Sequence, residues 1–91
     1  MTAVAERFAV RVMVTDVWDQ VFVAVSAATT VTELKRQALE RTLRKPGLRL
    51  DDYVVKFRGA QVLDESLMIG ALGARANSPF IVLPARRRPV R

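Results

Sequence analysis

The sequence predicts an α+β domain in which a mixed sheet of four to five strands carries one main helix across one face. Two observations lead to this class: a single amphipathic helix of normal length over residues 30–43, and strand-like alternation of apolar and polar residues on both sides of it. A lone helix must bury its apolar stripe against something, and the simplest partner is a sheet built from the flanking segments. Ninety-one residues allow one such domain and no second core.

The helix is predicted to begin after Thr30, because Thr30 and Glu33 have the spacing of a reciprocal cap. Residues at helical spacing are expected to face the sheet, namely Val31, Leu34, Ala38, Leu39 and Leu43. The charged residues of the same stretch are expected on the opposite side: Lys35, Arg36, Glu40, Arg41 and Arg44. Pro46-Gly47 is expected to stop the helix.

Two strands are predicted before the helix, over residues 8–14 and 20–25, joined by a short hairpin. Arg11 fixes the phase of the first strand, so Arg11 and Met13 face out. The residues expected to face the core are Phe8, Val10, Val12, Val14, Val21, Val23 and Val25.

After the helix, residues 53–58 form a strand in which Lys56 and Arg58 point out and Tyr53, Val55 and Phe57 point in. Gly59-Ala60 turns the chain into a short edge strand over residues 61–63. A brief helical turn starts at residues 64–67 and ends near Gly70 or Gly73. The apolar run 80–83 is predicted to be a buried strand near the middle of the sheet, closed by Pro84.

In this order and spacing, the segments resemble ubiquitin and its ubiquitin-like relatives, the β-grasp family, over residues 8–84. The resemblance lies in the opening hairpin, in the helix start at residues 30–35, and in residues 55–64, which are similar to the family's third strand, glycine turn and short fourth strand. Leu67 and Leu72 resemble the apolar residues of the family's brief second helix. The resulting division is a flexible N-terminus (1–7), a ubiquitin-like domain (8–84) and a flexible basic tail (85–91).

The tail departs from the pattern of ubiquitin, which ends in two glycines whose carboxylate is joined to lysines, since no glycine follows Gly73 here. Only residues without side chains thread the channels of the activating enzymes, so the resemblance implies a non-conjugating protein-interaction or adaptor module. The chain is also similar in size, and in its missing diglycine, to the small ubiquitin-like accessory proteins of bacterial type VII secretion. A bacterial protein is expected, and a modifier with atypical C-terminal processing is one alternative.

The chain contains neither cysteine nor histidine, which removes thiolate chemistry, the commonest general base and the commonest transition-metal ligand. No catalytic residue, metal site, cofactor or small-molecule substrate is therefore expected, and we predict that the protein is not an enzyme. Residues 1–8 lack the apolar core of a signal peptide, and no apolar run reaches membrane-spanning length. A cytoplasmic location is expected.

Other proteins are the expected partners, bound on the face of the sheet away from the helix. Met13 and Ala24 lie there, together with the predicted binding residues Arg11, Phe22, Val54, Lys56, Arg58, Ile81 and Leu83. Apolar patches rimmed by charge often mark partner sites, and ubiquitin-like folds are most often recognised on this face. Because Lys56 stands where ubiquitin has an isoleucine, ubiquitin's own receptors are not expected to bind. The alternative is a small sheet whose free face is apolar for lack of polar surface.

Two further features are candidate sites. Trp18, in the hairpin loop, is either an interface anchor or a side chain folded back onto the sheet. Four of the six net positive charges lie in the tail, on Arg86, Arg87, Arg88 and Arg91, which leaves +2 for residues 1–85. These arginines either bind nucleic acid or an anionic surface, the second functional alternative, or form a solvated tail.

Overall fold

The computed structural model describes residues 7–43 and 49–85. The tail arginines and the predicted helix stop at Pro46-Gly47 lie outside these residues. One α-helix, α1 (Val31–Thr42), and two short 3-10 helices, η1 (Leu50–Asp52) and η2 (Ile69–Leu72), accompany five strands. The strands are β1 (Arg7–Val14), β2 (Asp19–Ser26), β3 (Tyr53–Phe57), β4 (Ala60–Gln61) and β5 (Pro79–Pro84).

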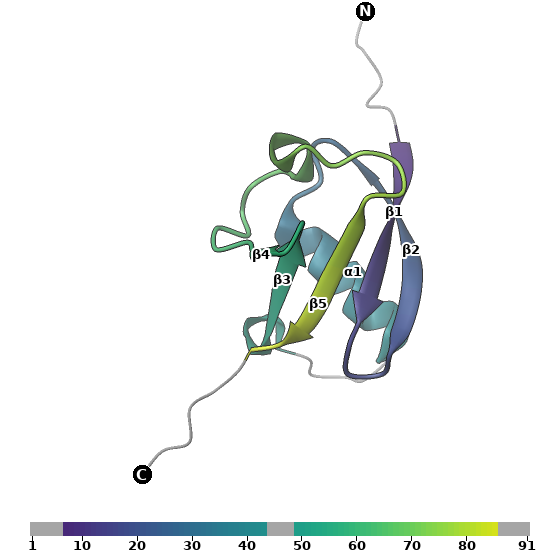
Figure 1. Cartoon of the computed structure of the whole chain (residues 1–91), viewed down its shortest axis with the longest axis vertical. Helices are drawn as coiled ribbons and strands as arrows, with labels where there is room; N and C mark the ends of the chain where they lie inside the picture. The colour runs from purple at the N-terminus through teal and green to yellow at the C-terminus, as the bar shows by residue number, and fades with distance from the viewer. Residues whose placement is uncertain (1–6, 44–48, 86–91) are drawn as a thin grey trace, which may run out of the picture.

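The five strands form one mixed sheet in the order β2-β1-β5-β3-β4, with α1 across one face (Figure 1). β1 pairs antiparallel with β2 and parallel with β5, which in turn pairs antiparallel with β3. The predicted central position of the last strand is therefore confirmed. The short fourth strand is Ala60–Gln61 rather than residues 61–63, and β1 begins at Arg7, inside the segment expected to be a flexible N-terminus.

Strand β5 is not buried on both sides as the apolar run suggested. Phe80 and Val82 are buried, whereas Ile81 is 40% exposed and Leu83 is half-buried. The physical reason is that α1 covers only one face of the sheet. A central position gives β5 two neighbouring strands, but it leaves the residues of the other phase at the surface.

The core lies between the sheet and α1, and the predicted strand phases are confirmed. Val31, Leu34, Ala38 and Leu39 of the helix are buried against strand residues. The buried strand residues are Val10, Val12, Val14, Val23, Val25, Val55, Phe57, Phe80 and Val82, and the inward residues Phe8, Val21 and Tyr53 are partly buried at the rim of this core. Phe57 and Phe80 face each other across β3 and β5, with ring centroids 4.6 Å apart. Each such buried apolar side chain contributes roughly 1.5–3 kcal/mol.

The start of α1 makes one of the two hydrogen bonds of the predicted reciprocal cap. Thr30 Oγ1 accepts a hydrogen bond from the Glu33 backbone N–H at 3.1 Å. The reciprocal bond is not made, because the Glu33 carboxylate turns along the helix and accepts from Arg36 and Gln37 instead. Glu33 thus strengthens the exposed side of the helix rather than its end.

The remaining N–H groups of the first turn are satisfied by the segment before η2. Val31 N–H donates to the Leu67 carbonyl at 3.0 Å, and Thr32 N–H donates to the Glu65 carbonyl at 2.9 Å. Ile69 N–H donates in the other direction, to the Thr29 carbonyl at 2.8 Å. Free amides at a helix start need such partners, so residues 65–69 and the helix start hold each other in place.

Lys35 corrects the sequence prediction most clearly, because it is not on the solvent-facing side of α1. Its side chain is 2% exposed, and its Nζ lies 2.7 Å from the Leu50 carbonyl, 2.9 Å from the Tyr53 carbonyl and 2.5 Å from Glu65 Oε1. A lysine ammonium has three hydrogens to donate, and these three acceptors match them. The segments around η1 and before η2 cover the flank of the helix on which Lys35 lies.

The β1–β2 hairpin is fastened to the start of β3. The Tyr53 hydroxyl donates a hydrogen bond to Asp16 Oδ2 at 2.9 Å. Partial burial raises the pKa of Tyr53 above its usual value, and the hydrogen bond to Asp16 and its negative charge raise that pKa further. This hydrogen bond joins the hairpin loop to the first residue of β3.

This bond can be tested by titration, because Tyr53 is the only tyrosine in the chain. We predict that the Tyr53 phenol titrates above the ordinary tyrosine pKa of about 10. The titration is measured by the ultraviolet absorbance of the phenolate. Since the pKa is raised by folding, the contribution to stability is complete below about pH 10 and is lost as the pH rises through the folded-state pKa. Asp16→Asn, which removes only the charge, should lower the pKa of Tyr53 part of the way. An unchanged pKa in that variant would contradict the assignment.

Candidate functional site: the free face of the sheet

The free face is the side of the sheet that α1 does not cover, and it is the side toward the viewer in Figure 1. We use the name for the exposed or half-buried strand residues whose phase directs them away from the helix. They are Arg7, Ala9, Arg11, Met13, Gln20, Phe22, Ala24, Val54, Lys56, Gln61, Pro79, Ile81 and Leu83.

The strand register places one row of these residues across all five strands. Ile81 lies opposite Met13 of β1 on one side and Lys56 of β3 on the other. The row continues outward to Gln20 of β2 and to Gln61 of β4. The middle of the free face is thus Met13, Ile81 and Lys56, with polar side chains at both ends.

Six of the seven predicted binding residues lie on the free face. Beside the central row, Arg11 pairs with Phe22 toward one end of the sheet, and Val54 pairs with Leu83 toward the other. Phe22 is 50% exposed and Ile81 is 40% exposed. An apolar surface with charged side chains among it is therefore present where the strand phases predicted it, although its role as a site stays a prediction.

Arg58 is the exception, because it was predicted on the free face and does not lie there. It lies in the turn after β3 with a left-handed backbone (φ 56°), so the alternation of the strand no longer sets its direction. Its guanidinium lies over the ring of Phe57, 5.0 Å from the centroid. That ring belongs to the core, and cation–π stacking on it directs the arginine away from the other six residues.

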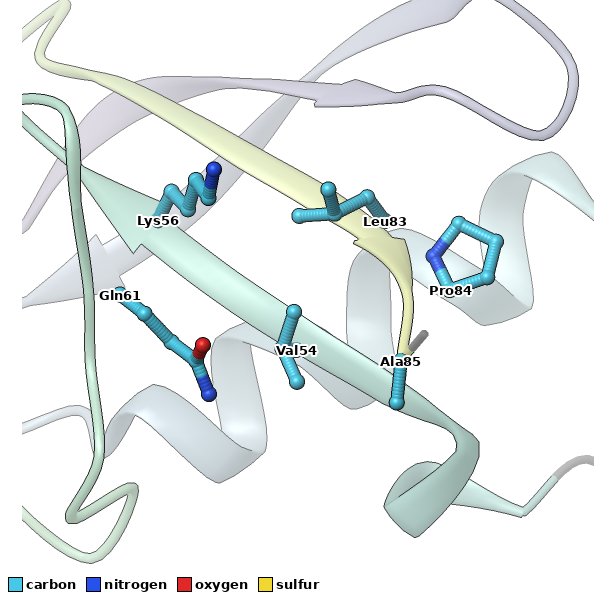
Figure 2. Close-up of a pocket in the computed structure, with 6 residues that line it drawn as sticks. All are labelled: Val54, Lys56, Gln61, Leu83, Pro84 and Ala85. Atoms are coloured by element: carbon cyan, nitrogen blue, oxygen red, sulfur yellow. The ribbon is translucent and has the colours of Figure 1, made fainter. Parts of the chain in front are cut away.

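A shallow hollow of about 430 Å³ lies at the β4 side of the free face. Its lining comes from three strands and the residue that follows β5, namely Val54, Lys56, Gln61, Leu83, Pro84 and Ala85. Figure 2 shows Lys56 and Gln61 at one end of the group, Pro84 and Ala85 at the other, and Val54 and Leu83 between them. The hollow combines an apolar floor with one cation, and three of its residues are among the predicted site residues.

Ala85 lines one end of the hollow, and no pattern in the sequence indicates its position. Ala85 N–H donates to the Asp52 carbonyl at 2.7 Å, so the chain beyond β5 is fastened to η1 for at least one residue. Ala85, which was predicted to belong to the flexible tail, therefore has a fixed hydrogen-bond partner.

Comparison with solved structures gives the fold class. The chain is similar to the ubiquitin-like domain of an Arabidopsis thaliana protein, with a TM-score of 0.73 over 99% of this chain and 89% of that one. This is a ubiquitin-like β-grasp fold. The two sequences are 17% identical, so the similarity concerns the fold alone. No protein-family model matches the sequence, and no curated protein matches it.

Within this ubiquitin-like fold, Trp18 lies at the tip of the β1–β2 hairpin and is 78% exposed. It does not fold back onto the sheet, which was the alternative to an anchor. Its backbone is left-handed (φ 49°), an uncommon conformation for a bulky residue. Neighbouring Val17 is 44% exposed. The hairpin tip therefore presents apolar surface that does little for the core.

A second group of exposed apolar side chains lies on the segment between β4 and η2, and it was not predicted from the sequence. Leu63 is 85% exposed, Met68 53% and Leu67 39%. Leu67 was expected to pack as part of the family's second helix, but that turn begins later, at Ile69, which is fully buried in its place. Asp64 accepts hydrogen bonds from the Ser66 N–H and hydroxyl, and this turn delays the helix.

The described residues contain no cluster of three or more acidic side chains placed to hold a metal ion. Asp51 and Asp52 belong to η1, and Asp64 and Glu65 belong to the turn before η2. Among the helices of the described segments, none is long and apolar enough to cross a membrane.

The conformation of Trp18 gives a stability test. A left-handed backbone costs a non-glycine residue about 1–2 kcal/mol, while glycine loses about 0.5–1 kcal/mol in chain entropy. We therefore expect Trp18→Gly to leave the free energy of unfolding unchanged or to raise it by up to about 1.5 kcal/mol, measured by urea denaturation.

Gly59→Ala is the matched control, because Gly59 is also left-handed (φ 82°) and nothing lies within 4 Å of the place that an alanine methyl group would take. It should lower the free energy of unfolding by up to about 1.5 kcal/mol, which is the strain of the left-handed backbone less the chain entropy that glycine would lose. If Trp18→Gly instead destabilises the protein by more than about 1 kcal/mol, the indole packs on the fold and is not a free anchor.

Proposed function

We propose that this ubiquitin-like domain is a protein-interaction module that binds its partner through the free face of the sheet. The observation that carries the proposal is that Ile81, in the middle of that face, and Phe22, toward one end of it, both stay substantially exposed, with a hollow at Lys56 on the β4 side. Large exposed apolar side chains gathered on one face favour partner binding over a merely solvated surface. The sheet edge next to the hollow is the two-residue strand β4, so side chains rather than backbone pairing provide most of the contact surface there.

We also propose a cellular role for the domain. An adaptor role, as an accessory component of a bacterial machinery such as type VII secretion, is consistent with one small domain and one open face. Non-conjugation stays an expectation that rests on the sequence. Nucleic-acid or anionic-surface binding by the tail also stays a prediction, because those arginines lie outside the described residues.

The test is partner capture by free-face variants of the full chain. Lys56→Glu and Leu83→Asp should each keep the circular dichroism spectrum and melting transition of the wild type, because neither side chain belongs to the buried core. Each should weaken capture of the partner from a lysate of the source cells by about tenfold or more, since changes at an interface centre cost roughly 1–2 kcal/mol or more. Capture is quantified by mass spectrometry against wild-type bait.

Two matched controls make the same chemical changes elsewhere. Arg49→Glu reverses an exposed charge in the loop before η1, and Leu63→Asp replaces an 85% exposed leucine outside the free face. Both should capture the partner at the wild-type level. If the two free-face variants also do so, or if Leu63→Asp alone loses capture, the free face is not the binding surface.

A further inference from the structure

The charged side chains of the free face are all cations. Arg7 and Arg11 of β1 and Lys56 of β3 point to this side, and no aspartate or glutamate has the outward phase in any of the five strands. Arg7 donates to the Ala24 carbonyl and Arg11 to the Asn77 carbonyl, each at 3.3 Å. Neither of these backbone acceptors neutralises the charge.

The carboxylates of the described residues lie elsewhere, and several are already engaged. Glu33 and Glu40 pair with Arg36 on the far side of α1, and Glu65 pairs with the buried Lys35. Asp16 accepts from Tyr53, and Asp64 accepts from Ser66. Lys56 consequently makes no ion pair with any residue that the structure describes.

Lys56 is the cation that a partner must cover, because it is in the central row. It lies between Ile81 and Gln61, and Val54 precedes it by two residues on the same face. An apolar partner that docked on Ile81, Leu83 and Val54 would remove water from the ammonium group. Removing water from a charge is costly unless a partner group of opposite charge replaces it.

We infer that the partner segment is an acidic, apolar peptide: its apolar side chains cover Ile81, Leu83 and Val54, and one of its carboxylates pairs with Lys56 in the hollow beside β4. The inference rests on the proposed function and specifies the chemistry of the partner at that same site. Arg11, on the other side of the central row, provides a second position for an acidic side chain.

A peptide fits this surface better than a nucleic acid does. Single-stranded nucleic acids need aromatic side chains for stacking beside the cations, whereas Met13, Ile81, Leu83 and Val54 are aliphatic. Phe22 is the sole aromatic residue of the free face, and it lies on β2, three strands away from Lys56. The cations are separated by apolar residues rather than aligned along a phosphate backbone.

The experiment is a nuclear magnetic resonance titration of the full isotopically labelled chain with three blocked synthetic peptides. The peptides have the same length and alternate leucine with glutamate, lysine or glutamine. A thymidine oligonucleotide is the fourth probe. We expect the glutamate peptide to shift the amides of Lys56, Ile81 and Leu83, and to bind about fivefold or more tightly than the glutamine peptide. In Lys56→Glu this preference should reverse in favour of the lysine peptide.

The outcomes separate this inference from the proposed function. If the glutamine peptide binds the free face as tightly as the glutamate peptide, or if Lys56→Glu binds the glutamate peptide as wild type does, the acidic partner is excluded and the binding face stands. If no peptide shifts a free-face amide at millimolar concentration, or if the shifts map to residues 63–68, both proposals fail. Tighter binding of the oligonucleotide at the same amides would replace the peptide with a nucleic acid and overturn the inference.

Discussion

A buried ammonium group joins the helix to the two irregular segments that lie beside it. Lys35 reaches from α1 to the carbonyls of Leu50 and Tyr53, at the start of β3, and to the carboxylate of Glu65, before η2. A lysine buried to this extent is tolerated only when its charge and its three hydrogens are matched. The group therefore constrains both segments at once, because moving either one leaves the charge short of an acceptor.

The segments that Lys35 contacts lie on the same side of the sheet as the helix. Residues 50–53 and 65–69 are held against the helix by Lys35, and the carbonyls of Glu65 and Leu67 also accept from the amides of its first turn. They are consequently not available to cover the opposite side of the sheet. The free face, with Ile81 and Lys56 at its centre, is left to solvent or to another molecule. The interaction that completes the fold and the surface proposed for binding lie on opposite sides of the same sheet.

The regular parts of this ubiquitin-like fold could be predicted from the sequence, because side-chain periodicity directly reports which side an element buries. Arg11 set the phase of β1, and Lys56 set that of β3, and both phases are confirmed. Periodicity could not predict Lys35, since its burial comes from segments far away in the sequence. The predictions for Arg58 and Leu67 were wrong for a related reason, because a turn ends the repeating geometry at each place. The turn is at Arg58–Gly59 in the first case and at Asp64–Ser66 in the second. Ala85 lines the hollow beside β4 and is held by a hydrogen bond to the Asp52 carbonyl, for which the sequence carries no pattern.

Native-state hydrogen exchange at Thr32 and Ile69 tests most directly whether Lys35 unites these segments with the core. Their amides donate across the junction between the helix start and residues 65–69. We predict that both exchange with the same free energy of opening as Val12 in the sheet, to within about 1 kcal/mol, and that Lys35→Met lowers their values below that of Val12. Exchange of Thr32 and Ile69 in the wild type at a free energy more than about 2 kcal/mol below that of Val12 would show that the segment opens on its own, and would contradict the role assigned to Lys35.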